Sequence, residues 1–150
     1  MAETKDDRNS ITQSEWEVMR IIWTLGEVRT GQVIKELQGK KDWSDSTIKT
    51  LMRRLVQKGL LKTRKEGRCF VYKPTISQRK MMSEVTLHMM QNMCDMHKGE
   101  VLIQLLKEAP LSKGDIKTMQ QELKLKEKDA PDMVPCCLLY TSDAADDMQC

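Results

Sequence analysis

The order of the hydrophobic patterns along residues 12–74 constrains the fold more than any other feature of the sequence. Three short segments come first, and each places apolar residues at the spacing of one helix face. A segment of strand-like alternation follows, with Gly67 at its centre. This order predicts three short helices followed by a β-hairpin.

Residues that favour helix ends bound the first two of these helices. Thr12 and Glu15 have the spacing of a capping box, and Gly26 ends the first helix. The second helix fits the segment RTGQVIKELQG and ends at Gly39. Their inward faces are apolar, with Trp16, Met19, Ile22 and Trp23 in the first helix and Val33, Ile34 and Leu37 in the second.

The third helix has two different faces. It begins at Ser44 or Asp45, which are both favourable N-caps, and it ends at Gly59. One face is apolar and contains Ile48, Leu51, Met52, Leu55 and Val56. The other face carries hydroxyl and basic side chains, namely Thr47, Thr50, Arg54 and Lys58. Such a face suits contacts to the base edges and phosphates of a nucleic acid.

The segment LLKTRKEGRCFVYKP predicts the hairpin. Gly67 supplies the turn, aromatic and β-branched residues fit the return strand, and Pro74 ends it. Three helices and a hairpin are the elements of a winged helix-turn-helix domain. In that motif the third helix enters the major groove of DNA and the hairpin lies along its backbone. The predicted fold class is therefore mainly α with a small β-hairpin.

The charge distribution agrees with this fold. Residues 29–80 hold 15 Lys and Arg against 4 Asp and Glu, whereas residues 1–28 hold 3 against 6 and residues 81–150 hold 7 against 12. A basic block confined to one third of the chain predicts a polyanionic partner for that third, here double-stranded DNA. A basic surface that is merely solvated is the alternative interpretation.

The predicted DNA contacts fall into two sets. The base-reading set lies on the third helix and consists of Ser46, Thr47, Lys49, Thr50 and Arg54. The phosphate set lies on the same helix and around the hairpin and consists of Arg53, Lys58, Lys62, Arg64, Lys65 and Arg68. Phosphate contacts supply affinity, whereas base contacts supply sequence preference.

The rest of the chain is predicted to be helical and to form a homodimer. Residues 77–108 have apolar residues at helical spacing, Pro110 interrupts the pattern, and a capping box of Ser112 and Asp115 starts another helix. These helices have broad apolar faces and no sheet to cover them, so we expect a second copy to do so. The predicted parts are a flexible tail (1–10), a winged helix-turn-helix domain (11–75), a helical dimerisation region (77–128) and a C-terminal tail (129–150).

Two stretches of the sequence carry a family resemblance. ITQSEWEVMRIIW and WSDSTIKTLMRRLVQKGLLKTRKEGRCFVY resemble the CopY/BlaI/MecI family of bacterial repressors, over about residues 11 to 125. The resemblance implies a homodimeric winged-helix repressor that binds an inverted repeat with TACA/TGTA half-sites. It also implies release either by proteolysis, as in the β-lactam branch, or by copper(I) that displaces zinc at C-terminal cysteines, as in the copper branch.

The copper-responsive branch is the closer match. Gln104 and Leu105 stand where the β-lactam branch has its cleaved Asn-Phe pair. The segment KDAPDMVPC is similar to the entry into the metal site of the copper branch, which has two Cys-x-Cys pairs separated by four residues. Here only Cys136 stands where the first ligand is expected. Cys137 is adjacent to it rather than one residue further, and only the distant Cys150 follows, without a second Cys-x-Cys pair. We therefore expect the site for zinc or copper(I) to be incomplete, in a segment that is truncated or replaced.

Other functions fit the sequence less well. The Met-rich segment around Cys94 and His97 is an alternative copper(I) site, although methionines also fill adaptable dimer cores. No nucleotide-binding glycine loop and no HExxH motif occur, so we expect neither an enzyme nor a small-molecule substrate. The chain has no run of 18 apolar residues and no signal-peptide core, which predicts a cytoplasmic protein without a membrane span. The alternatives are a β-lactam-responsive repressor and a metal-buffering or interaction module whose basic surface is incidental.

Overall fold

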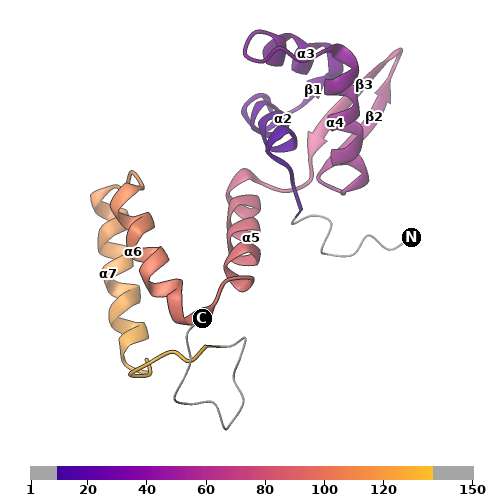
Figure 1. Cartoon of the computed structure of the whole chain (residues 1–150). Helices are drawn as coiled ribbons and strands as arrows, with labels where there is room; N and C mark the ends of the chain where they lie inside the picture. The colour runs from indigo at the N-terminus through magenta and orange to yellow at the C-terminus, as the bar shows by residue number, and fades with distance from the viewer. Residues whose placement is uncertain (1–9, 137–150) are drawn as a thin grey trace. The chain divides into compact units, whose positions relative to one another are not determined.

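The structure is a computed structural model that describes residues 10–136 (Figure 1). The chain divides into two compact units, Met1–His88 and Met89–Cys150. Helices predominate, and the strands form one small antiparallel sheet. The predicted fold class, mainly α with a small β-hairpin, is confirmed.

Three helices and a three-stranded sheet make up most of the first unit. The helices are α2 (Gln13–Leu25), α3 (Thr30–Gln38) and α4 (Asp45–Gln57), and the strands are β1 (Val28–Arg29), β2 (Leu61–Glu66) and β3 (Cys69–Pro74). The strand order is β1-β3-β2, and Figure 1 shows the β2-β3 hairpin beside α4. The three predicted helices and the hairpin, called the wing below, are confirmed. The sequence does not predict β1, because two residues are too few to show an alternation.

Local hydrogen bonds set the starts of the helices. Thr12 Oγ1 accepts from the backbone N–H of Glu15 at 3.2 Å, and the Glu15 carboxylate accepts from the Thr12 N–H at 3.2 Å. Ser44 Oγ caps α4 by accepting from the N–H of Thr47 at 3.2 Å. Side-chain oxygens thus satisfy backbone donors that have no partner within the helix. The predicted capping box and the Ser44 cap are confirmed.

One hydrophobic cluster joins the helices of this unit to the sheet. Its core residues are Val18, Met19, Ile22, Val28, Val33, Leu37, Ile48, Leu51, Met52, Leu55, Leu60, Leu61 and Met81. Met81 belongs to α5 (Gln78–Gln91) and is fully buried, so the start of this helix shares the core. The rings of Trp16 and Trp23 pack edge to face, with 5.6 Å between their centroids. The Trp23 indole N–H donates to the carbonyl of Ile76 at 2.9 Å. Packing of α2 therefore fixes the segment that leads into α5.

The second unit contains a short 3-10 helix, η1 (Asp95–His97), followed by α6 (Lys98–Glu108) and α7 (Lys113–Glu127). The helical pattern predicted for residues 77–108 is interrupted, because α5 ends at Gln91 and Asn92 and Asp95 flank the break. Asn and Asp compete for backbone hydrogen bonds and so disfavour helix interiors.

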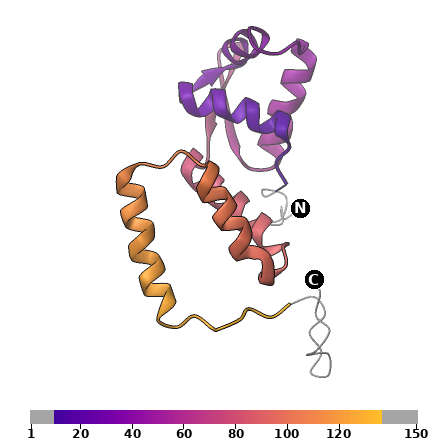
Figure 2. The ribbon, with the colours of Figure 1, turned by 60° about the vertical axis from the view of Figure 1, so that its left-hand side comes forward.

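The helices α6 and α7 leave their apolar side chains uncovered. Figure 2 shows α6 and α7 separated from each other, and neither helix has a buried residue. Their exposed large apolar residues are Leu102, Ile103, Leu105, Leu106, Ile116, Leu123 and Leu125. Apolar faces of this kind are what a dimerisation region requires. Within the described part of the chain, no helix is long and apolar enough to cross a membrane.

Candidate nucleic-acid interface

The polar face of α4 is hollowed where the base-reading residues are predicted. Ser46, Thr47, Thr50, Leu51 and Arg54 line a shallow hollow of about 230 Å³. Four of these five residues belong to the predicted base-reading set. The structure therefore brings together hydroxyl groups, one apolar side chain and one guanidinium on a single helix face.

The hydroxyl groups of this face are ordered by hydrogen bonds to each other and to the backbone. Ser44 Oγ lies 2.9 Å from Thr47 Oγ1 and 3.0 Å from Ser46 Oγ. Thr50 Oγ1 donates to the carbonyl of Ser46 at 2.8 Å. An ordered hydroxyl keeps lone pairs that can accept from a base edge, and it loses less conformational freedom on binding. The face is thus prepared for contacts that need short side chains.

Three cations of α4 are available for DNA. Lys49, Arg53 and Arg54 are exposed, and none of them takes part in an ion pair with another residue in the range 10–136. Arg54 lines the hollow, whereas Lys49 and Arg53 lie outside it. Long cations without an acidic partner can reach phosphates or guanine edges.

Lys58, one of the predicted phosphate contacts, is paired with an acidic side chain within the fold. Its Nζ lies 2.6 Å from Glu15 Oε2 and donates to the carbonyl of Ser10 at 3.1 Å. The side chain of Glu15 is 1% exposed and that of Lys58 is 18% exposed, so the pair is largely removed from water. A cation held in this way is committed to the fold. In the structure Lys58 therefore supports the packing of α4 against α2.

Among the predicted phosphate contacts of the wing, three are free cations and the fourth is paired. Lys62, Lys65 and Arg68 are exposed and form no ion pair within the described residues. Gly67 has φ +63, a conformation that favours glycine, so the turn can be tight. Arg64 differs, because Glu27 and Glu66 both accept hydrogen bonds from its guanidinium.

Arg64 and Glu27 also shift each other's titration. The hydrogen bond and the positive charge of Arg64 hold the pKa of the Glu27 carboxyl below its usual value. The hydrogen bond to Glu27 raises the pKa of Arg64. Both groups are therefore fully charged at neutral pH. The sequence did not reveal that Lys58 pairs with Glu15 or that Arg64 pairs with Glu27, because these partners lie far away along the chain.

The predicted metal ligands are only partly within the described residues. Cys136 is fully buried, and its Sγ lies 3.8 Å from the Sγ of Cys94, whereas Cys137 lies outside the described residues. Among residues 10–136 no three His, Cys, Asp or Glu side chains are grouped closely enough to hold a metal ion. A structural zinc site needs four ligands. The donors in this part of the chain therefore do not form a zinc site.

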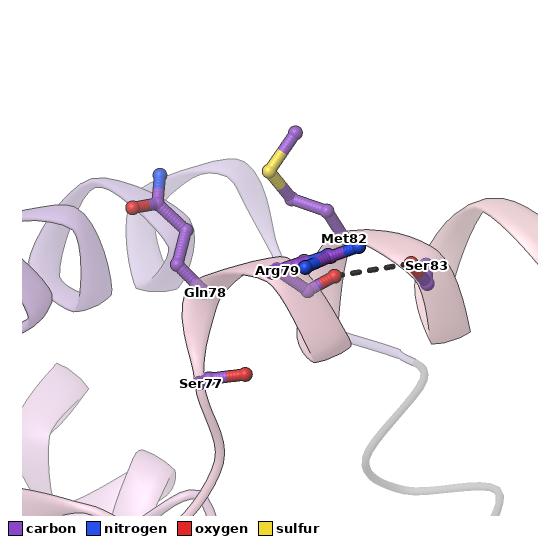
Figure 3. A pocket seen from close by; sticks show the side chains of 5 residues that line it. All are labelled: Ser77, Gln78, Arg79, Met82 and Ser83. Atoms are coloured by element: carbon purple, nitrogen blue, oxygen red, sulfur yellow. Dashed lines mark hydrogen bonds between the residues drawn. The ribbon is translucent and has the colours of Figure 1, made fainter. Parts of the chain in front are cut away.

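A second hollow lies at the first turns of α5 and has a volume of about 590 Å³ (Figure 3). Its described lining residues are Ser77, Gln78, Arg79, Met82 and Ser83, and Ser83 Oγ donates to the carbonyl of Arg79 at 3.1 Å. Among these lining residues there is no carboxylate, imidazole or thiol. The described lining therefore offers no general base to its two serine hydroxyls.

Comparisons with known proteins agree with this geometry. A model of the penicillinase repressor family matches residues 11–125. The "Uncharacterized 16.5 kDa protein in ptsI 3′ region" of Latilactobacillus sakei is 48% identical over 134 residues, which cover 89% of this chain and 92% of that protein. The penicillinase repressor of Bacillus licheniformis is 47% identical over 68 residues, which cover 45% of this chain and 53% of that protein. The methicillin resistance regulatory protein MecI of Staphylococcus aureus (strain N315) is 28% identical over 116 residues, which cover 77% of this chain and 94% of that protein.

Proposed function

The chain belongs to the penicillinase repressor family, and we propose that it represses transcription as a homodimer that binds double-stranded operator DNA through α4 and the wing. The family is one of repressors, which agrees with the expectation that the chain is not an enzyme. One observation carries the proposed mode of binding. The hollow lined by Ser46, Thr47, Thr50 and Arg54 lies on an exposed helix face. The exposed cations of that helix, Lys49, Arg53 and Arg54, form no ion pair among residues 10–136.

The division of contacts follows from side-chain length. α4 enters the major groove, where Ser46, Thr47 and Thr50 reach base edges and thymine methyl groups, and Arg54 reaches guanine. Lys62, Lys65 and Arg68 of the wing track the phosphates. A second copy places another α4 in the next half-site, so a two-fold symmetric protein reads an inverted repeat. The half-sites TACA/TGTA, which the family resemblance implies, are the operator that we propose.

The apolar face of α6 supplies the contact between the two copies. Leu102, Leu105 and Leu106 lie at i, i+3 and i+4 and are about half exposed. The double substitution Leu102→Asp/Leu106→Asp is expected to produce a monomer, because it would place two carboxylates in an apolar interface. Sedimentation equilibrium measures the mass, and a gel shift on the full inverted repeat measures the accompanying loss of operator binding.

Gln104→Asp is the matched control for this double variant. It adds a carboxylate to another face of α6, where Gln104 is exposed and donates to Glu108 at 2.5 Å. The control is expected to remain a dimer. A Leu102→Asp/Leu106→Asp variant that still sediments as a dimer would exclude this face as the interface.

We also propose that copper(I) is the signal that releases the repressor. One feature of the sequence supports this assignment, the similarity of KDAPDMVPC to the copper branch. Thiolates are the soft ligands that copper(I) and zinc prefer. Because the described donors do not complete a metal site, we derive no release step through a metal. The competing proposal is release by proteolysis at Gln104 and Leu105, which are exposed on α6.

A gel-shift titration tests both the proposed operator binding and the proposed release by copper(I). The full chain is titrated onto a duplex with TACA/TGTA half-sites and onto a scrambled duplex, with zinc, copper(I) or neither. We expect selective binding of a dimer to the half-sites and release by copper(I). Selective binding that neither ion alters, together with cleavage between Gln104 and Leu105 in β-lactam-treated cells, would favour the β-lactam branch. Equal binding to both duplexes would reject the proposed operator.

A further inference from the structure

Four charged side chains connect the two outer strands of the sheet. Arg64 of β2 donates to Glu27, which directly precedes β1, and to Glu66 at 3.2 Å. Arg29 of β1 lies 3.6 Å from Glu66. The four residues form one network, called the wing network below, and all four side chains are about half exposed. The network therefore crosses the sheet from one edge strand to the other.

The strand register shows what this network covers. Arg29 and Arg64 both lie directly opposite Val71 of the middle strand β3. Residues that are directly opposite each other in an antiparallel sheet point to the same face. Val71 is only 6% exposed, yet it does not belong to the hydrophobic cluster. The aliphatic stems of the two arginines are thus placed to shield Val71 on the face away from the core.

Arg64 is the only one of the wing's predicted phosphate contacts that is already bound to acidic groups. Carboxylates and phosphates are both strong acceptors for a guanidinium. A DNA phosphate that approaches Arg64 therefore competes with Glu27 and Glu66 for its guanidinium. Lys62, Lys65 and Arg68 have no such competitor within the described residues.

We propose that Glu27 and Glu66 withhold Arg64 from the DNA backbone and so limit the sequence-independent affinity of the wing. This inference rests on the proposed DNA binding and corrects the predicted role of Arg64. The two carboxylates act as an internal substitute for phosphate. Their effect is to keep one cation in the fold of the wing, where it would otherwise strengthen binding to every DNA sequence equally.

The test uses the double variant Glu27→Gln/Glu66→Gln of the full chain and a scrambled duplex between 50 and 200 mM salt. A freed Arg64 adds one phosphate contact, which steepens the dependence of log K on log salt by about 0.9. The loss of affinity over this fourfold salt range is then expected to be about 3.5 times larger than in the wild type. Affinity at 50 mM salt is expected to rise accordingly.

Loss of two negative charges could strengthen DNA binding without Arg64, so the same variant is also made with Arg64→Met. Methionine keeps an apolar side chain over Val71, and Arg64→Gln serves as a second version if the methionine variant does not fold. The increase in salt slope is expected to vanish in either background, and Arg64→Met alone is expected to leave the salt slope on the scrambled duplex unchanged.

Three results would overturn the inference. They are an unchanged salt slope in Glu27→Gln/Glu66→Gln, an increase in salt slope that persists without Arg64, and a shallower slope for Arg64→Met alone, which would mean that Arg64 already contacts phosphate. All these readouts use scrambled DNA. A wild-type protein that shows no operator preference would therefore reject the proposed function, while the response of the scrambled duplex to these variants would still decide the inference.

Discussion

The substitution Lys58→Met is expected to lower the free energy of unfolding by about 3 to 5 kcal/mol, the usual cost of removing one partner from a buried ion pair. The carboxylate of Glu15 is 1% exposed and lies 2.6 Å from Lys58 Nζ. Without the ammonium group, a negative charge remains buried beside the core. Urea denaturation of the full chain, followed by circular dichroism, measures the change.

Two further variants distinguish the loss of the buried ion pair from the loss of a positive charge alone. Lys49→Met removes an exposed lysine from the same helix and is expected to change stability by no more than about 0.5 kcal/mol. Glu15→Gln combined with Lys58→Met is expected to recover part of the loss, because no unpaired charge remains. Equal unfolding curves for Lys58→Met and Lys49→Met would show that the buried pair contributes nothing.

The ion pair also explains how the recognition surface is held. Lys58 follows the last residue of α4, and Glu15 belongs to the capping box that starts α2. The pair therefore connects the end of one helix to the start of another, and the bond to the Ser10 carbonyl adds the segment before α2. A helix that reads base edges must be held at a fixed angle, so this contact supports DNA binding indirectly.

Arg54→Ala is expected to reduce the preference for the proposed operator over scrambled DNA by about 5-fold to 150-fold, which corresponds to the roughly 1 to 3 kcal/mol of one good base contact. Arg54 lines the hollow on α4, is exposed, and forms no ion pair within residues 10–136. Its guanidinium is therefore free to bind a base edge. Parallel gel-shift titrations on the two duplexes measure the preference.

Lys65→Ala is the matched control, because it removes an exposed cation from the wing. It is expected to weaken binding to both duplexes by the same factor. It is also expected to make the slope of log K against log salt shallower by about 0.9. Equal losses on both duplexes for Arg54→Ala and Lys65→Ala alike would contradict the division into base-reading and phosphate residues.

Much of the first unit could be predicted because its signals are local. The Thr12–Glu15 capping box, the Ser44 cap and the turn at Gly67 each involve residues within three positions of one another. Hydrogen bonds of this kind form whenever the local sequence is right. The apolar face of α4 was predicted for a similar reason, since helical periodicity places its residues together before any tertiary contact forms.

Sequence alone was less informative about which cations reach DNA. Lysine and arginine are compatible with a phosphate contact, a base contact or an ion pair, and their spacing does not distinguish these roles. Lys49, Arg53 and Arg54 are exposed in the structure. Lys58 instead pairs with Glu15, which is 43 residues away, and Arg64 with Glu27, which is 37 residues away. The break after α5 was missed because the apolar spacing continues across it.

The sequence by itself determined the helix starts, the turn of the wing, the amphipathic α4 and the concentration of basic residues in one third of the chain, because these depend on neighbours within a few positions. Only the tertiary structure decided that Lys58 is buried against Glu15, that Glu27 binds Arg64, and that Cys94 approaches Cys136. The physical reason is that an ion pair or a sulfur contact depends on the distance between side chains. Folding sets that distance for residues that lie far apart along the chain.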